Sequence, residues 1–329
     1  MPKVSVIIPV FNAEKYIERC LDALSSQTFG DFEAICVNDG SKDNSLKILK
    51  EYQKKDNRIK VFSRFHSGPA NARHKAISKS QGKYIMFCDA DDYYENNMIE
   101  IMVTAIEKYN TDLVMCNTNI CCLDGFKSND ETIENYPILK LEGYYDITPQ
   151  NITEINDILW NKIFKKELMD IHKIEYPKKY EHDDASFLMR YLLYSKSYYG
   201  VNKKLYNYFV YNKNSVMGRL YTNQNKNHEF DFCHALDEDL SFLSKRDDIS
   251  DKLKLKFINK FIYHIQYFYT ILPAERQDKA HKYILKLIKN NKILLQNPAF
   301  SQLLGCKNRN ELNSRFRYLF GTLDLKYWY

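Results

Sequence analysis

An apolar run that stops at a cluster of carboxylates is the first feature of the sequence that could do chemistry. Residues 84–88 are uncharged and mostly bulky, and Asp89, Asp91 and Asp92 follow them directly. A run without polar alternation predicts a strand buried on both faces, and the carboxyl ends of strands open onto the ligand crevice of an α/β sheet. Two such carboxylates, one residue apart, supply oxygen ligands suited to Mg²⁺ or Mn²⁺. The three aspartates could instead be turn or helix-capping residues.

Other useful side chains follow the neighbouring predicted strands. Asp39 comes after the second apolar run, where its carboxylate can accept a hydrogen bond from a base N–H. Phe11 follows the first run and can pack beside a base, and Arg73 begins a helical stretch from which it can neutralise phosphate charge. Taken singly, Asp39 could be an Asx-turn residue and Arg73 a surface arginine. Their convergence with the carboxylates above predicts one functional crevice.

A second acidic pair, Asp183 and Asp184, lies further along the chain. Phe187, Leu188 and Tyr191 are spaced as the buried face of a helix, which places both aspartates in its first turn. The helix dipole favours negative charge there, so a capping role alone would explain the pair.

The elements that must position these residues alternate between strand and helix patterns. Apolar runs predict strands at 4–10, 32–37, 59–62 and 84–88, with helical spacing at 16–24, 45–54, 70–77 and 98–108. Such alternation predicts parallel pairing with right-handed crossovers. We therefore expect an α/β fold with a Rossmann-like, mostly parallel sheet flanked by helices. Gly40 permits a tight turn after the second strand.

The second half of the chain carries weaker strand signals. Residues 117–149 are rich in Asn, Asp, Gly and Thr and are predicted to be a long insert near the site. From about residue 221 the pattern is helical, with helices expected at 228–243, 252–272 and 281–295. We therefore expect the sheet to be followed by a smaller C-terminal α-helical region.

Composition is that of a globular protein without a membrane span. The chain has 329 residues, of which 44% are apolar and 27% charged, and no apolar segment reaches bilayer length. Its eight cysteines lack metal-ligand spacing and its start lacks a secretory signal, so we expect reduced thiols in a cytoplasmic protein.

Charge is distributed unevenly along the chain. The net charge is +6, and residues 251–329 hold 15 lysines and arginines against 5 acidic residues. A basic terminal region predicts contact with an anionic surface or polymer, although it could equally be a solvated face. No zinc module or RNA motif indicates nucleic-acid binding.

The N-terminal part of the chain resembles a family 2 glycosyltransferase of the GT-A fold. The stretches that carry the likeness are VSVIIPVFNAEKYIERCLDALSSQTF, VNDGSKDNS, SGPANARHKAI and GKYIMFCDADDYYE. The similarity covers about residues 3–218 and implies an inverting transferase that uses a UDP-sugar. It places uracil at Asp39 and the turn at 9–12, the ribose and sugar near Asp89, and a Mn²⁺ or Mg²⁺ ion near Asp91. His66 and His74 stand where the family often has amides.

The resemblance also implies roles for the acidic pair. Residues 158–168 are similar to a Trp-Asn-Lys signature of the family, and 183–187 fit its Glu-Asp-x-x-Phe motif with Asp183 in place of Glu. By that match Asp184 is the general base, and Asp183 holds a sugar hydroxyl. A loop near 212–219 is expected to close over the diphosphate with Lys213 or Arg219, unless both are exposed and inert. The expected donor-binding residues are Pro9, Phe11, Asn12, Glu14, Asp39, Gly40, Ser67, Arg73, Asp89 and Asp91.

We therefore expect a GT-A catalytic domain over residues 1–220 and a basic helical domain over 221–329. The second domain would contact the acceptor, another subunit or the inner face of the plasma membrane. The expected activity is metal-dependent transfer of a sugar from a UDP-sugar to a hydroxyl of a glycan or lipid-linked acceptor in bacterial cell-surface polysaccharide synthesis.

Two alternatives stay open. A sugar-nucleotide nucleotidyltransferase also uses a doubly wound sheet and a metal. It would need a Gly-rich basic loop after the first strand, where this chain has the sequence FNAE at 11–14. A non-enzymatic glycan-binding or scaffold protein with a relic site is the other, and the intact Asp39, Asp89, Asp91 and Asp184 argue against it.

Overall fold

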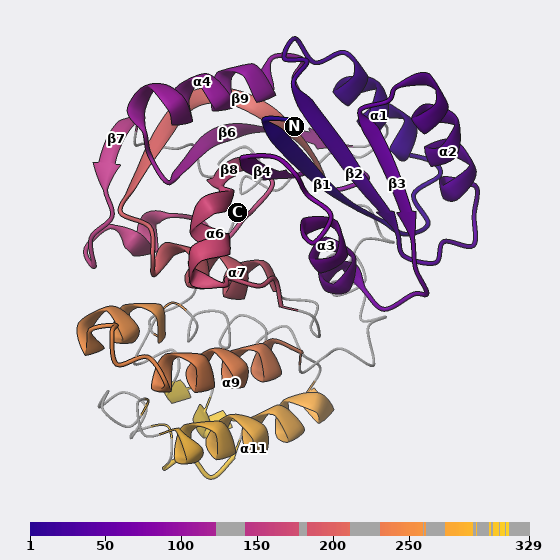
Figure 1. Cartoon of the computed structure of the whole chain (residues 1–329). Coiled ribbons are helices and arrows are strands. Elements are labelled where there is room, and N and C mark those ends of the chain that lie inside the picture. The colour runs from indigo at the N-terminus through magenta and orange to yellow at the C-terminus, as the bar shows by residue number, and fades with distance from the viewer. Residues whose placement is uncertain are drawn as a thin grey trace.

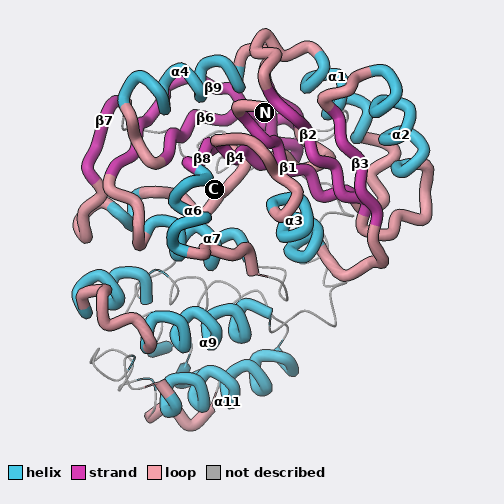
Figure 2. Tube along the Cα trace, in the orientation of Figure 1, coloured by secondary structure: helices cyan, strands magenta, loops and turns pink. Residues whose placement is uncertain are grey.

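A mixed sheet with helices on both faces forms the larger part of the molecule (Figure 1). The computed structural model describes residues 1–122, 142–177, 183–210, 231–258 and 274–291, with short pieces at 260, 294, 303, 305–308, 310–312 and 314–315. Figure 2 separates the strands and helices of these parts by colour.

Strands and helices alternate over the first half of the chain, as predicted. The elements there are β1 (Val4–Val10), α1 (Ile17–Ser25), β2 (Phe32–Asn38), α2 (Ser45–Lys55), β3 (Ile59–Ser63), α3 (Pro69–Ile77), β4 (Tyr84–Phe87), β5 (Tyr93–Tyr94) and α4 (Met98–Tyr109). They are followed by β6 (Leu113–Cys122), β7 (Gly143–Asp146), a 3-10 helix (Ile152–Glu154), β8 (Lys162–Lys165), α6 (Lys166–His172), α7 (Asp183–Leu192), β9 (Ser197–Val210), α9 (Asp231–Ser244) and α11 (Ala274–Asn290).

Strand order creates a crevice at the carboxyl ends of the central strands. The order is β3-β2-β1-β4-β8-β6-β9-β5, with β7 paired to β9. β1 pairs in parallel with β2 and β4, so the chain returns from β3 across β1 to reach β4. Ligands of open α/β sheets bind at such a reversal of strand order. β8 runs antiparallel to β4 and β6, which makes the second half of the sheet mixed.

Two apolar cores, one on each face of the sheet, explain the continuous apolar strands. Val4, Val6 and Ile8 of β1 pack with α1, α2 and α4, whereas Ile7 faces the core shared with α3, α6 and α7. These two sets of helices lie on opposite sides of the sheet in Figure 1. Because both faces of β1 and β2 are covered, neither strand needs the polar alternation of a solvent-exposed strand.

The segment predicted to be an insert is strand at both of its ends. β6 continues to Cys122 and β7 begins at Gly143, and residues 123–141 lie outside the described parts of the chain. In β6 the amide of Asn117 donates to Asn202 Oδ1 at 2.8 Å, and that of Asn119 donates to Asn207 Oδ1 at 3.0 Å. The strand escaped prediction because its apolar run is short, at 113–116, and the polar residues 117–119 that follow break the apolar pattern.

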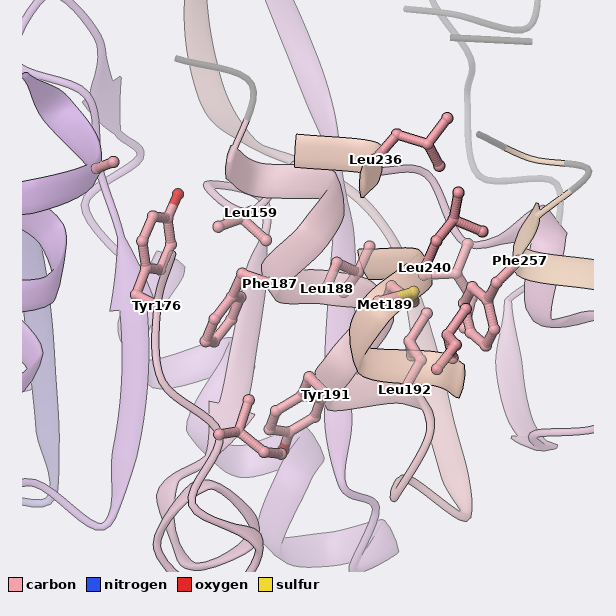
Figure 3. Packing of buried hydrophobic residues seen from close by; sticks show 14 of the residues in the cluster. Leu159, Tyr176, Phe187, Leu188, Met189, Tyr191, Leu192, Leu236, Leu240 and Phe257 are labelled. Carbon is pink, nitrogen blue, oxygen red and sulfur yellow. The ribbon is translucent and has the colours of Figure 1, made fainter. Parts of the chain in front are cut away.

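Helices α9 and α11 pack below α7 (Figure 1). Leu236 and Leu240 of α9 belong to the same core as Phe187 and Leu188 of α7, and this packing is seen from close by in Figure 3. The core therefore continues from the sheet through α7 into the C-terminal helices. The expected helix at 252–272 is described only at 251–258 and 260, and the rest of it, with the tail after residue 315, lies outside the described residues.

No helix in the described part of the chain is both long enough and apolar enough to cross a membrane. Among the same residues, free thiols are found at Cys20, Cys36, Cys88, Cys116, Cys121 and Cys306.

A buried carboxylate joins α9 to α7. Ser186 Oγ donates to Asp239 Oδ2 at 2.5 Å, and Arg190 Nη2 lies 2.9 Å from Asp239 Oδ1. Burial raises the pKa of Asp239 to about 6, although the Arg190 charge and the Ser186 hydrogen bond oppose the rise. Because this folded-state pKa lies above the ordinary value, the carboxyl stabilises the fold below about pH 4, and that contribution is lost as the pH rises through about 6.

We expect Asp239→Asn, which cannot ionise, to gain stability relative to the wild type as the pH is raised from about 4 to about 8. The measurement is the difference in free energy of unfolding from urea titrations across that range. Asp237→Asn is the matched control, because Asp237 is exposed on the same helix. A difference that does not depend on pH would contradict the assignment of a destabilising buried charge.

Candidate active site

Carboxylates from two elements meet across one arginine. Asp89 follows β4, Asp184 lies in the first turn of α7, and Arg73 belongs to α3. Arg73 Nη2 lies 2.9 Å from Asp89 Oδ1, and Nη1 lies 3.3 Å from Asp184 Oδ1. Only 10% of the Arg73 side chain is exposed. Three residues that were predicted separately therefore lie together, because the switch point brings β4 and α3 next to the start of α7.

Arg73 is directed at these two carboxylates, whereas the sequence suggested that it would neutralise phosphate. A planar guanidinium can hold two carboxylates at once through its separate nitrogens. Burial raises the pKa of Asp89, Arg73 opposes that rise and the nearby Asp184 charge adds to it. The Asp89 side chain keeps 30% of its surface exposed, so it still faces the crevice.

Tyr176 completes this group and was missed in the sequence. Its hydroxyl donates to Asp184 Oδ1 and accepts from Arg73 Nη1 at 3.3 Å. The residue precedes Pro177 in a segment without regular secondary structure, where no periodicity marks a function. Only its type, a tyrosine in an apolar context, could have hinted at a buried hydroxyl that needs partners.

Asp39 anchors the loop between β3 and α3. Its buried carboxylate accepts hydrogen bonds from the backbone N–H groups of Ser67 at 3.1 Å and Gly68 at 2.8 Å. Arg64 Nε lies 3.3 Å from Oδ1 and His66 Nδ1 lies 2.8 Å from Oδ2. A base N–H that uses Asp39 must therefore share this carboxylate with the donors of the loop.

Gly40 is required by the close approach of this loop. Its φ is +74°, and a Cβ atom there would come within 2.8 Å of the backbone nitrogen of His66. A side chain at position 40 would thus strain the backbone and push the loop away from Asp39. The sequence predicted the turn but not this contact.

Phe11 packs against an aromatic ring of the chain itself. The Phe11 and His66 ring centroids lie 4.0 Å apart with an interplanar angle of 19°. That separation leaves no room for a third ring between them, so a base must lie outside the stack or displace His66. The His66 side chain is 55% exposed, which makes it the more easily moved of the two.

The other predicted residues after β1 hold loops in place. Asn12 has a φ of 48°, and its Oδ1 accepts the backbone N–H of Lys42 at 2.9 Å. Glu14 Oε2 accepts from the backbone and side-chain nitrogens of Asn44 at 3.0 and 2.9 Å. Pro9 lies within β1. These contacts tie the turn after β1 to the loop that carries Asp39.

The three aspartates after β4 have different surroundings. Asp92 is buried and accepts from Tyr206 Oη and from the backbone N–H of Phe209, both at 2.8 Å. Burial raises the pKa of Asp92. The backbone carbonyl of Asp91 accepts from Arg19 Nη2 at 2.6 Å. Asp92 therefore attaches the loop after β4 to strand β9. The half-buried Asp91 lies in the turn of that loop.

Asp89 and Asp91 offer hard oxygen donors of the kind that Mg²⁺ and Mn²⁺ accept. Among the described residues, no group of three or more His, Cys, Asp or Glu side chains is arranged to hold a metal ion. Magnesium is commonly held by one or two carboxylates and completed by substrate phosphates, and this pair fits that pattern. Asp89 Oδ1 carries the Arg73 ion pair, so an ion bound here would share Asp89 with Arg73.

The Trp-Asn-Lys stretch supports the sheet beneath the site. Lys162 is buried, and its Nζ donates to Asn156 and Asn161 side chains and to the carbonyl of Ile158. Burial lowers the pKa of Lys162 to about 7. Trp160 stacks on Tyr206, the partner of Asp92, with ring centroids 4.2 Å apart. Through Tyr206, the Trp-Asn-Lys stretch thus helps to hold the loop that carries the three aspartates.

Comparison with known proteins places this geometry in a family. The sequence model of glycosyl transferase family 2 matches residues 5–170, half of the chain. The chain belongs to glycosyl transferase family 2. The match includes Asp39, Arg73, Asp89 and Asp91 and ends before the helix that carries Asp184.

Curated relatives of this family 2 chain come from several bacteria. EpsH of Bacillus subtilis (strain 168), named as a glycosyltransferase, is 34% identical over 215 residues, which are 64% of this chain and 61% of EpsH. The poly(ribitol-phosphate) beta-glucosyltransferase of Bacillus spizizenii (strain ATCC 23059 / NRRL B-14472 / W23) is 28% identical over 267 residues, which are 79% of this chain and 39% of that protein. The chain therefore spans about three fifths of the length of one relative and two fifths of the other.

A solved structure shares the fold of this family 2 chain. TarS 1-349 of S. aureus, crystallised in complex with UDP-GlcNAc, superposes with a TM-score of 0.73 at 21% sequence identity. The likeness covers 96% of this chain and 89% of that one. It confirms the GT-A fold that the sequence predicted, with helices after the sheet.

Some predicted residues lie outside what the structure describes. Asp183 begins α7, but its side chain is not among the described ones. Lys213 and Arg219, with the loop expected to close over the diphosphate, lie outside the described residues.

We expect Asp39→Ala to lower the free energy of unfolding by about 3 kcal/mol, because the backbone N–H groups of Ser67 and Gly68 and two basic side chains lose their buried acceptor. Urea titration measures the loss. Asp31→Ala is the matched control, since Asp31 is exposed just before β2. Equal losses in the two variants would show that Asp39 does not anchor the loop.

Proposed function

We propose that this chain is an inverting glycosyltransferase that moves a sugar from a UDP-sugar to a hydroxyl of a glycan or lipid-linked acceptor. The setting we infer is bacterial cell-surface polysaccharide synthesis. Family membership supports transferase activity. The name of the Bacillus spizizenii relative supports an acceptor of the poly(ribitol-phosphate) kind, and the UDP-GlcNAc complex of TarS supports a UDP-sugar donor.

The observation that carries the proposal is the pairing of Asp89 and Asp184 across Arg73. Asp89 ends a central strand at the switch point, where the donor of an α/β enzyme binds. Asp184 Oδ1 lies 3.3 Å from the same guanidinium. We propose that Asp89 belongs to the donor side of the site and that Asp184 meets the incoming acceptor.

The reaction needs one base and one leaving group. Asp184 takes the proton of the acceptor hydroxyl as its oxygen attacks the anomeric carbon of the sugar. The bond between that carbon and the diphosphate oxygen breaks, and UDP leaves on the opposite face. Because attack and departure occur on opposite faces in one displacement, the configuration of the sugar inverts.

On the donor side, we propose that Asp39 accepts a hydrogen bond from the N–H of uracil after the loop that carries His66 has moved away. Phe11 would pack beside the base, and Asp89 would contact the ribose and sugar. Asp91, with help from Asp89, would hold a Mg²⁺ or Mn²⁺ ion, which supplies positive charge for the diphosphate when bound. Asp183 would contact a sugar hydroxyl.

We also propose that residues 1–220 form the catalytic domain and that the basic helices of 221–329 contact the acceptor, a membrane surface or another subunit. The continuous core from α7 to α9 supports a helical region that is packed on the catalytic part.

Asp184→Asn should lower the rate of sugar transfer by about 100-fold or more, because general-base assistance contributes two to four orders of magnitude. Its affinity for UDP should stay unchanged, since Asp184 lies on the acceptor side. UDP release in the presence of acceptor, measured with a panel of UDP-sugars, tests the rate, and calorimetry tests the affinity.

Asp170→Asn is the matched control, because Asp170 is exposed on α6 and pairs only at the surface with Lys166. Transfer by Asp184→Asn at close to the wild-type rate would remove Asp184 as the base. No UDP binding or release by the wild type with any donor would favour the glycan-binding alternative.

Asp91→Ala should abolish metal-dependent hydrolysis of the accepted UDP-sugar, and EDTA should do the same to the wild type. Re-addition of Mn²⁺ or Mg²⁺ should restore the wild type but not the variant, because the variant lacks the carboxylate that shares the ion with the diphosphate. UDP release with and without EDTA is the measurement. Full activity of the wild type in EDTA would overturn the metal requirement.

A further inference from the structure

We propose that Tyr176 positions the general base: its hydroxyl fixes Asp184 so that Oδ2 is the oxygen that takes the acceptor proton. The inference rests on the proposed function, in which Asp184 is the base. It adds a residue that lies outside the matched family region and in no predicted motif.

The hydrogen bonds around Tyr176 have a fixed direction. Arg73 Nη1 can only donate hydrogen bonds, so the phenol oxygen of Tyr176 is the acceptor of this bond, at 3.3 Å. The single phenol proton is then directed to Asp184 Oδ1. Arg73 Nη1 also lies 3.3 Å from the same Oδ1. Two donors therefore converge on one oxygen of the carboxylate.

This convergence orients the other oxygen. The two oxygens of a carboxylate lie on opposite sides of its axis, so holding Oδ1 against Tyr176 and Arg73 turns Oδ2 away from both. The Asp184 side chain keeps 32% of its surface exposed, which leaves it open to an incoming hydroxyl. Without the Tyr176 hydroxyl, Oδ1 would keep the Arg73 Nη1 contact and lose its second donor. The carboxylate could then rotate, and Oδ2 would no longer be held toward the acceptor.

The ring of Tyr176 is held as firmly as its hydroxyl. It is 1% exposed, and its centroid lies 5.9 Å from that of Phe87 on β4 and 5.1 Å from that of Phe187 on α7. Figure 3 shows the hydroxyl of Tyr176 pointing away from Phe187. The ring thus bridges the strand that leads to Asp89 and the helix that carries Asp184, and a rigid ring can hold a catalytic group in place.

The test is Tyr176→Phe, which keeps the ring and removes only the hydroxyl. We expect kcat for transfer to fall about tenfold, the size of effect of one hydrogen bond to a charged group. The KM for the UDP-sugar and the affinity for UDP should not change. A fall in kcat with an unchanged KM is the signature of a base that is misplaced in the transition state.

Tyr191→Phe is the matched control. Tyr191 lies in the same aromatic cluster, with its ring centroid 5.0 Å from that of Phe164, and its hydroxyl donates to the carbonyl of Asp112 at 2.7 Å. Its loss should lower the melting temperature and leave both kcat and KM unchanged. A merely structural role for Tyr176 would give this same pattern.

The outcomes separate the two proposals. If the wild type is active, Asp184→Asn is inactive and Tyr176→Phe matches the wild type in kcat, then Tyr176 does not position the base. If Asp184→Asn is as active as the wild type, the proposed function itself loses its base, whatever Tyr176→Phe does. A fall in kcat at unchanged KM in Tyr176→Phe, and not in Tyr191→Phe, supports the assignment.

Discussion

A single guanidinium holds the two sides of the site together. Arg73 is almost buried and lies within hydrogen-bond or ion-pair distance of both Asp89 and Asp184. Two carboxylates that lie so near each other, partly withdrawn from water, would repel each other. Without a cation between them, both would resist ionisation. The packing of α3, β4 and α7 must therefore deliver all three groups at once.

Buried contacts below the crevice make that arrangement rigid. Tyr176 packs against both Phe87 and Phe187, which also contact each other, and its hydroxyl donates to Asp184. On the other side of β4, Asp92 is held by Tyr206, which in turn stacks on Trp160. Residues with no contact to a substrate thus set the position of the loop and the helix that carry the acids. Such supporting contacts decide how well a catalytic geometry is kept.

Helix α7 faces two ways, and this links the C-terminal helices to the site. Phe187 and Tyr191, four residues apart, pack toward the sheet. Ser186 and Arg190, also four apart, meet the buried Asp239 of α9. Residues spaced by four lie on one side of a helix, so the two pairs define its two buried sides. The helix that carries Asp184 is therefore clamped between the sheet and the helical region, and a change in α9 can reach the site through it.

The local pattern of the sequence determined the alternation of strands and helices, the strand ends that carry Asp39 and Asp89, and the helix start that carries Asp184, because periodicity and strand termini depend on neighbouring residues. It could not distinguish Asp92, which is buried, from Asp91, nor show that His66 already contacts Asp39. It also gave no signal for strand β6, whose middle is polar, or for the contacts of Tyr176. Only the tertiary structure decided these, because their partners are distant: Arg73 and Tyr176 are 103 residues apart, and Asp92 and Tyr206 are 114 apart. Contacts over such separations arise from packing of the whole sheet, and no local spacing records them.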